Sequence, residues 1–185
     1  MNQSIPELLQ GWQSYYVIIG SSAGALIGLQ FVVMALIADG PLPNTAGEAG
    51  VAAFGSPIIV HFCSALLLSA MLSAPWTAAS GVGTALEISG AIGMIYVIVV
   101  TRRATTQKSY QMVWEDWLWH IMLPFVAYGT YFISGIVFSE HHVGALFIAA
   151  VAPALLLYVG IHNAWDSITY SALRHAKARA EAANK

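Results

Sequence analysis

Five long apolar runs constrain this chain of 185 residues more than any other feature. They cover residues 15–38, 51–74, 80–100, 113–138 and 143–169. A transmembrane helix needs about 20 mostly apolar residues, and inside lipid a single segment can satisfy its backbone groups only as a helix. Because only 9% of the residues are charged and the mean hydropathy is +0.69, a water-soluble monomer is excluded. The sequence predicts an all-α polytopic membrane protein, a bundle of five transmembrane helices.

The basic residues predict how this bundle is oriented. All seven lysines and arginines follow the third or the fifth run, and they are Arg102, Arg103, Lys108, Arg174, Lys177, Arg179 and Lys185. With five spans, both groups fall on the same side of the membrane. The positive-inside rule then places the C-terminus in the cytoplasm and the N-terminus outside. We therefore expect a multi-pass protein of the cell (inner) membrane.

Aromatic residues near the ends of the runs agree with this orientation, because tryptophan and tyrosine favour the two membrane–water interfaces. The residues expected at the outer interface are Trp12, Tyr15, Tyr16 and Trp76. Those expected at the inner interface are Trp114, Trp117, Trp119 and Trp165.

The chain divides into a transmembrane domain, residues 1–170, and a basic tail, residues 171–185. The tail is rich in alanine and predicts a cytoplasmic helix near anionic headgroups. It is too short and too mixed in charge to indicate nucleic acid binding. Membrane lipid is therefore an expected partner, and no soluble partner is indicated. The first run lacks the preceding basic residues of a cleavable signal, so we expect it to be retained.

Small residues at four-residue spacing predict where helices pack. The first run carries Gly20, Gly24 and Gly28, and the third carries Gly81 and Gly93 on one stripe. Such stripes let helix backbones approach closely in lipid. They indicate packing within one protomer or between copies, and the small number of spans favours a homo-oligomer.

Ionisable side chains inside the runs form the candidate functional site. Asp116 and His120 enter the fourth span four residues apart, and His162 and Asp166 leave the fifth with the same spacing. Each pair therefore lies on one helix face, and antiparallel helices would bring the two pairs to matching depth. His61 of the second span lies about one turn deeper. The sequence thus predicts a shared polar site in the cytoplasmic half of the bundle.

Metal binding is the first interpretation of this site. Charged groups within a membrane are costly and usually functional, and imidazole with carboxylate suits Zn, Fe or Mn. The predicted ligands are His61, Asp116, His120, His162 and Asp166.

A proton or ion pathway is the second interpretation, since chains of His, Asp, Glu and Tyr carry protons. Its additional candidates are Glu87, Glu115 and Tyr158. Pro124 fits both interpretations, because it cannot donate a hydrogen bond to the carbonyl of His120. Haem held by two histidines and purely structural packing also stay open. No catalytic residue is predicted, because the chain has neither a nucleophile elbow nor a phosphate loop; a membrane metalloenzyme stays open.

Overall fold

The computed structural model describes residues 4–38, 48–106 and 113–183, and every element in these ranges is a helix. The elements are α1 (Ile5–Ala38), α2 (Glu48–Leu72), α3 (Ala79–Thr106), α4 (Trp114–Trp117), the π-helix η1 (Leu118–Met122), α5 (Leu123–Phe138) and α6 (His142–Ala183). Since α4, η1 and α5 follow one another without a break, they form one continuous helical segment. The all-α prediction is confirmed.

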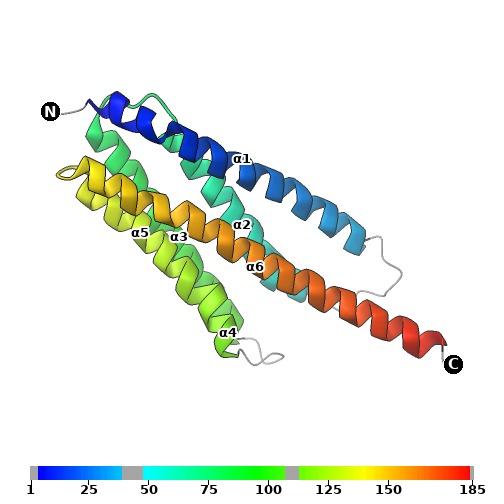
Figure 1. The fold of residues 1–185 in the computed structure, drawn as a ribbon. Coiled ribbons are helices and arrows are strands. Elements are labelled where there is room, and N and C mark those ends of the chain that lie inside the picture. The colour runs from blue at the N-terminus through cyan, green and yellow to red at the C-terminus, as the bar shows by residue number, and fades with distance from the viewer. Residues whose placement is uncertain (1–3, 39–47, 107–112, 184–185) are drawn as a thin grey trace.

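The long helices lie side by side as a bundle (Figure 1). One end of the bundle holds the start of α1, the α2–α3 connection and the α5–α6 turn; we call it the N-terminal end. The opposite end holds α4 and the end of α6, which extends past the other helices (Figure 1). The main packing contacts join α3 to α5, α5 to α6, α1 to α2 and α2 to α6.

Four helices are long and apolar enough to cross a membrane, namely Ile5–Ala35, Ala79–Thr106, Trp114–Phe138 and His142–Thr169. These helices indicate a multi-pass membrane protein. The apolar described part of α2 covers only Pro57–Leu72, which is shorter. The count of five spans therefore stays a prediction.

Helix α1 begins ten residues before the first apolar run because its start is capped. The backbone N–H of Ser4 donates to the Glu7 carboxylate at 3.0 Å, and the Ser4 carbonyl accepts from the N–H of Leu8 at 3.0 Å. A serine followed three residues later by glutamate is a helix-start signature. At the other end of the chain, α6 continues without interruption to Ala183 and includes most of the basic tail.

Glycines bring the backbones of α3 and α5 into direct contact. A Cβ atom added to Gly90 would lie 2.4 Å from the backbone nitrogen of Phe132, and one added to Gly135 would lie 2.6 Å from the carbonyl oxygen of Gly83. A Cβ atom on Gly93 would lie 1.9 Å from the ring of Tyr128. Only glycine lets these helices approach so closely.

The other glycines of the predicted stripes have different surroundings. A Cβ atom on Gly81 would lie 2.8 Å from the Trp76 ring, and one on Gly20 would lie 3.1 Å from Cβ of Ser69 in α2. At Gly24 and Gly28 an added Cβ would meet nothing within 4 Å in the described part of the chain. The α1 stripe thus contacts α2 at only one of its three glycines among the described residues.

Candidate functional site

The π-helix η1 ends just before α5, whose second residue is Pro124. The N–H of Leu123 donates to the carbonyl of Leu118, five residues back. The next bond in this register would run from Pro124 to the carbonyl of Trp119, but proline has no N–H. The side-chain amide of Asn163 in α6 donates to that carbonyl instead, at 3.4 Å. Single π-turns inside α-helices occur frequently at functional sites.

The same turn places Trp119 against His162 of α6. Their rings stack with centroids 3.6 Å apart and planes 7° apart. Nδ1 of His162 lies 3.5 Å from the Asp166 carboxylate and 3.5 Å from the side-chain oxygen of Asn163. Trp119, expected at the membrane interface, therefore packs within the site and fixes the plane of the imidazole.

Two of the predicted site residues, His162 and Asp166, meet across one turn of α6. His120 lies in η1, next to Trp119, whose ring stacks on His162. The Asp116 carboxylate accepts a hydrogen bond from the N–H of Val113 at 3.0 Å, which caps the start of α4.

A metal ion requires closer convergence than this arrangement provides. Across residues 4–38, 48–106 and 113–183, no group of three or more His, Cys, Asp or Glu side chains could hold a metal ion. Metal binding at this cluster, with the named ligands, therefore stays a prediction from the sequence and gains no support from the geometry.

Helices α2 and α5 share a buried hydrogen-bonded group next to this cluster. Nδ1 of His61 lies 3.1 Å from the hydroxyl of Tyr128, which lies 3.0 Å from Oγ of Ser64. His61 and Tyr128 are each only 1% exposed. Sequence reasoning missed Tyr128 and Ser64. The sequence held a signal for Ser64, which follows His61 by about one helical turn, but none for Tyr128.

Further buried hydroxyls continue from this group toward the N-terminal end. Tyr131 lies about one turn after Tyr128 in α5 and is fully buried, as is Tyr16 of α1. The rings of Tyr15 and Tyr16 are 5.2 Å apart, and the Tyr15 hydroxyl donates to the carbonyl of Ala150 in α6. We call this row of buried and half-buried side chains the polar file. Its members are His61, Ser64, Tyr128, Tyr131 and Tyr16.

Several atoms of the polar file have no hydrogen-bond partner among the described residues. They are Nε2 of His61 and the hydroxyls of Tyr16 and Tyr131, together with Oγ of the nearby Ser69. Buried polar atoms in proteins nearly always have a partner, either protein or ordered water. The row therefore has free donor and acceptor capacity deep inside the bundle.

The three additional relay candidates lie elsewhere. Glu115 and Tyr158 are exposed, and the Tyr158 ring lies 5.5 Å from the Trp119 ring on the outer side of α6. Glu87 is half-buried between α3 and α5, where an added Cβ on Gly135 would come within 2.6 Å of its Cγ. These positions place Glu115 and Tyr158 at the surface of the site and Glu87 at the glycine-lined helix contact.

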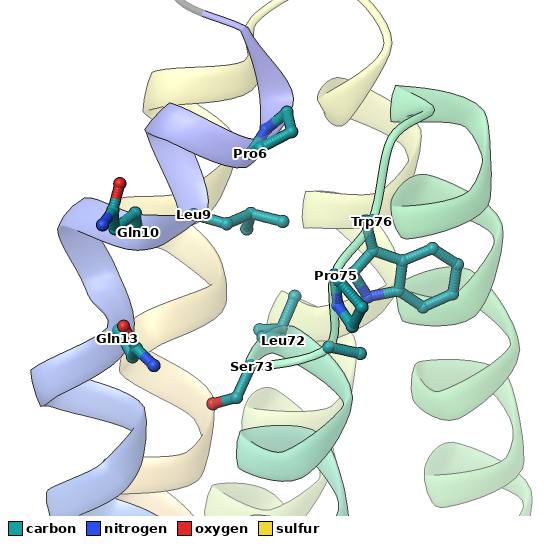
Figure 2. Close-up of a pocket in the computed structure, with 9 residues that line it drawn as sticks. Pro6, Leu9, Gln10, Gln13, Leu72, Ser73, Pro75 and Trp76 are labelled. Atoms are coloured by element: carbon teal, nitrogen blue, oxygen red, sulfur yellow. The ribbon is translucent and has the colours of Figure 1, made fainter.

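The N-terminal end of the bundle carries two hollows. One of about 260 Å³ lies between α1 and the α2–α3 connection (Figure 2). There Leu9 points from α1 toward Leu72 and Trp76, and Gln10 and Gln13 lie along its α1 wall (Figure 2). The other, of about 440 Å³, lies between α1 and α6.

The fold and this site together define an all-helical bundle whose long apolar helices indicate a membrane protein and whose apolar core contains a few buried polar side chains. Comparisons with protein-family models, with curated proteins and with solved structures find no match to this chain. The functional argument therefore rests on the geometry of the described residues.

Proposed function

We propose that this chain is a multi-pass protein of the inner cell membrane that conducts protons through its bundle along the polar file. The observation that carries this proposal is the buried hydrogen-bonded group of His61, Tyr128 and Ser64. Hydroxyl and imidazole groups can each both donate and accept a hydrogen bond. A row of them can therefore pass a proton along by reversing its hydrogen bonds.

The polar file extends toward both ends of the bundle, which a conduction route requires. Toward the α4 end, the proposed route runs from His61 through His120 of η1 to the partly exposed pair of His162 and Asp166, whose side chains lie 3.5 Å apart. Ionisable residues within a membrane commonly mark proton relays. Histidine is suited to this role because its unperturbed pKa lies near neutral pH.

Toward the N-terminal end, the proposed route runs through the buried Tyr131 to Tyr16 and Tyr15, the last two of which have rings 5.2 Å apart. The hydroxyls of Tyr131 and Tyr16 are buried and have no partner among the described residues. A buried water commonly makes about three hydrogen bonds to such groups. We infer that water bridges these hydroxyls and joins them to the His61 group.

The proposed orientation has the N-terminal end outside and the α4 end in the cytoplasm. Arg102 and Arg103 are exposed at the end of α3, which lies at the α4 end of the bundle. Helix α2 packs against both α1 and α6, which supports a fifth crossing. With five crossings, the basic tail falls on the same side as the two arginines, as the positive-inside rule requires.

The proposal is tested by proton flux in liposomes that contain the purified protein and a pH-sensitive dye. Tyr128→Phe keeps the buried ring but removes the hydroxyl that bridges His61 and Ser64. We expect it to lower the flux about tenfold or more, in the range typical for losing one proton-transfer group. Tyr158→Phe is the matched control, because Tyr158 is 60% exposed and lies outside the polar file.

Two outcomes contradict proton conduction. One is a wild-type flux no higher than that of empty liposomes. The other is a Tyr128→Phe protein that keeps the unfolding temperature and the flux of the wild type. The first outcome would show that the protein does not conduct protons. The second would show that protons do not pass along the polar file.

Metal binding is the second candidate function, and the observation behind it is the sequence pattern that places three histidines and two aspartates in one layer of the bundle. Elemental analysis of the purified protein tests it separately from flux. We expect stoichiometric Zn, Fe or Mn that is lost in His120→Ala and His162→Ala if this candidate is correct. A wild-type protein without stoichiometric metal contradicts it, and a haem absorption band would identify haem instead.

A further inference from the structure

An aromatic hollow at the N-terminal end of the bundle forms a second candidate site, far along the chain from His61 and its neighbours. It lies between α1 and α6 and has a volume of about 440 Å³. We call it the aromatic groove. Its lining residues are Glu7, Leu8, Gly11, Trp12, Tyr15 and Phe147.

Three aromatic rings of the groove stand nearly at right angles. The Trp12 and Tyr15 rings have centroids 5.9 Å apart and planes at 89°. The Trp12 and Phe147 rings have centroids 4.8 Å apart and planes at 80°. In each of these edge-to-face pairs the edge of one ring meets the face of the other, so only the ring faces left uncovered, such as that of the exposed Phe147, are open to a guest. The faces of such rings attract cations, most strongly the face of tryptophan.

The groove also carries a negative charge that no basic side chain neutralises locally. Glu7 is exposed at its rim, and its carboxylate accepts a hydrogen bond from the N–H of Ser4. All lysines and arginines of the chain lie between residues 102 and 185. Of these, Arg102 and Arg103 lie at the α4 end of the bundle, opposite the groove. Glu7 is therefore the one charged side chain among the described residues that line the groove.

We propose that the aromatic groove binds a methylated ammonium group. Such a group is large and weakly hydrated, so its attraction to aromatic faces offsets the free energy lost when it leaves water. The acidic rim of Glu7 selects for the positive charge, while Trp12, Tyr15 and Phe147 select for the apolar methyl shell. The neighbouring hollow in Figure 2 differs in chemistry, because its α1 wall offers the neutral amides of Gln10 and Gln13.

Gly11 offers a way to close the groove without disturbing the fold. A Cβ atom added there would meet nothing within 4 Å in the described structure. A Gly11→Leu side chain would therefore grow into the groove rather than into a neighbouring helix. Gly24→Leu is the matched control, since it also faces open space on α1 but lies outside the groove.

The test is a calorimetric titration of choline chloride into the full chain, held in a maltoside detergent that has no ammonium headgroup. We expect saturable binding to the wild type and to Gly24→Leu. Binding should weaken about tenfold in Trp12→Leu, as expected for losing one cation–π contact, and should be lost in Gly11→Leu. The neutral analogue with tert-butyl in place of trimethylammonium should bind at least about tenfold more weakly than choline.

The ammonium group can belong to a lipid or to a free solute, and repeating the titration in lipid nanodiscs distinguishes these sources. A lower apparent affinity in phosphatidylcholine discs than in phosphatidylglycerol discs assigns the groove to a lipid headgroup. Equal affinity assigns it to a soluble cation. The proposal is overturned if wild-type protein does not bind choline, if the neutral analogue binds as tightly, or if Gly11→Leu binds like the wild type.

Discussion

Gly93→Ala, a substitution in α3, is expected to displace Tyr128 of α5, the central residue of the polar file. The added Cβ atom would lie 1.9 Å from Cδ1, 2.3 Å from Cγ and 2.4 Å from Cε1 of Tyr128. Ordinary carbon contacts are about 3.5–4.0 Å, so the ring would have to move by more than roughly 1 Å. The ring is 1% exposed and has little room to move. Its hydroxyl would therefore leave His61 and Ser64.

The size of the effect follows from three contributions. Overpacking a close-packed core costs about 1–3 kcal/mol. Leaving the buried hydrogen-bonding atoms of His61 and Tyr128 without partners costs a further ~1–3 kcal/mol. Alanine recovers up to about 1 kcal/mol because it is the better helix former. We expect Gly93→Ala to lower the free energy of unfolding by about 2–4 kcal/mol and to lower proton flux as Tyr128→Phe does.

Reversible unfolding in mixed detergent micelles measures this loss, and a double-mutant cycle assigns its cause. In a Tyr128→Ala background the ring is absent, so adding Gly93→Ala should cost nothing or stabilise slightly. Gly24→Ala, which meets open space, should be neutral or slightly stabilising. The reasoning is refuted if Gly93→Ala is as stable as Gly24→Ala, or if its cost is the same with and without the Tyr128 ring.

The remaining predictions concern hydrogen bonds between helices, and each is measured by the same unfolding assay. Asn163→Ala should cost about 1–3 kcal/mol because the carbonyl of Trp119 loses its donor; the loss should shrink in a Pro124→Ala background, where a backbone N–H is restored. Ser134→Ala should cost about 1 kcal/mol because its hydroxyl donates across to α6 at 2.7 Å. Ser22→Ala is its control and should cost nothing measurable, because that hydroxyl bonds only within α1. An equal loss in Ser22→Ala and Ser134→Ala would contradict an interhelical role.

The helical segments could be predicted from the sequence because lipid leaves the backbone few alternatives. The apolar runs locate α3, α5 and α6 closely, although the ends of the helices differ. Helix α1 begins at Ile5 rather than near residue 15, because Ser4 and Glu7 cap it. That serine–glutamate spacing was visible in the sequence, but a search by hydropathy alone does not detect it.

The candidate site was predicted only where its residues lie close in sequence. The four-residue spacing between His162 and Asp166 gives the 3.5 Å approach of their side chains. The pairing of His61 with Tyr128 joins positions 67 residues apart, and it depends on which helices are neighbours. A single sequence does not specify which helices are neighbours. Tyr128 therefore looked like one more aromatic residue in an apolar span.

The π-helix shows a second limit of reasoning from periodicity. An α-helical period assumes that each carbonyl is met four residues later, yet at η1 the register widens to five. The sequence shows that Pro124 lacks a backbone N–H. It does not show that the carbonyl of Trp119 accepts instead from Asn163, which lies 44 residues after Trp119, in α6. The stacking of Trp119 on His162 likewise depends on which helices are neighbours, and the helical period does not predict it.

The partner of His61 also bears on the choice between proton conduction and metal binding. A metal-bound imidazole usually donates its other N–H to a fixed acceptor, such as a carboxylate or a backbone carbonyl, which locks its tautomer. Nδ1 of His61 instead meets the hydroxyl of Tyr128, and that hydroxyl meets the hydroxyl of Ser64. Both hydroxyls can reverse their direction of donation, so His61 can change tautomer without moving. A proton relay requires a histidine that can change tautomer, whereas a metal ligand is normally held in one tautomer. The surroundings of His61 therefore favour proton conduction over metal binding at this residue.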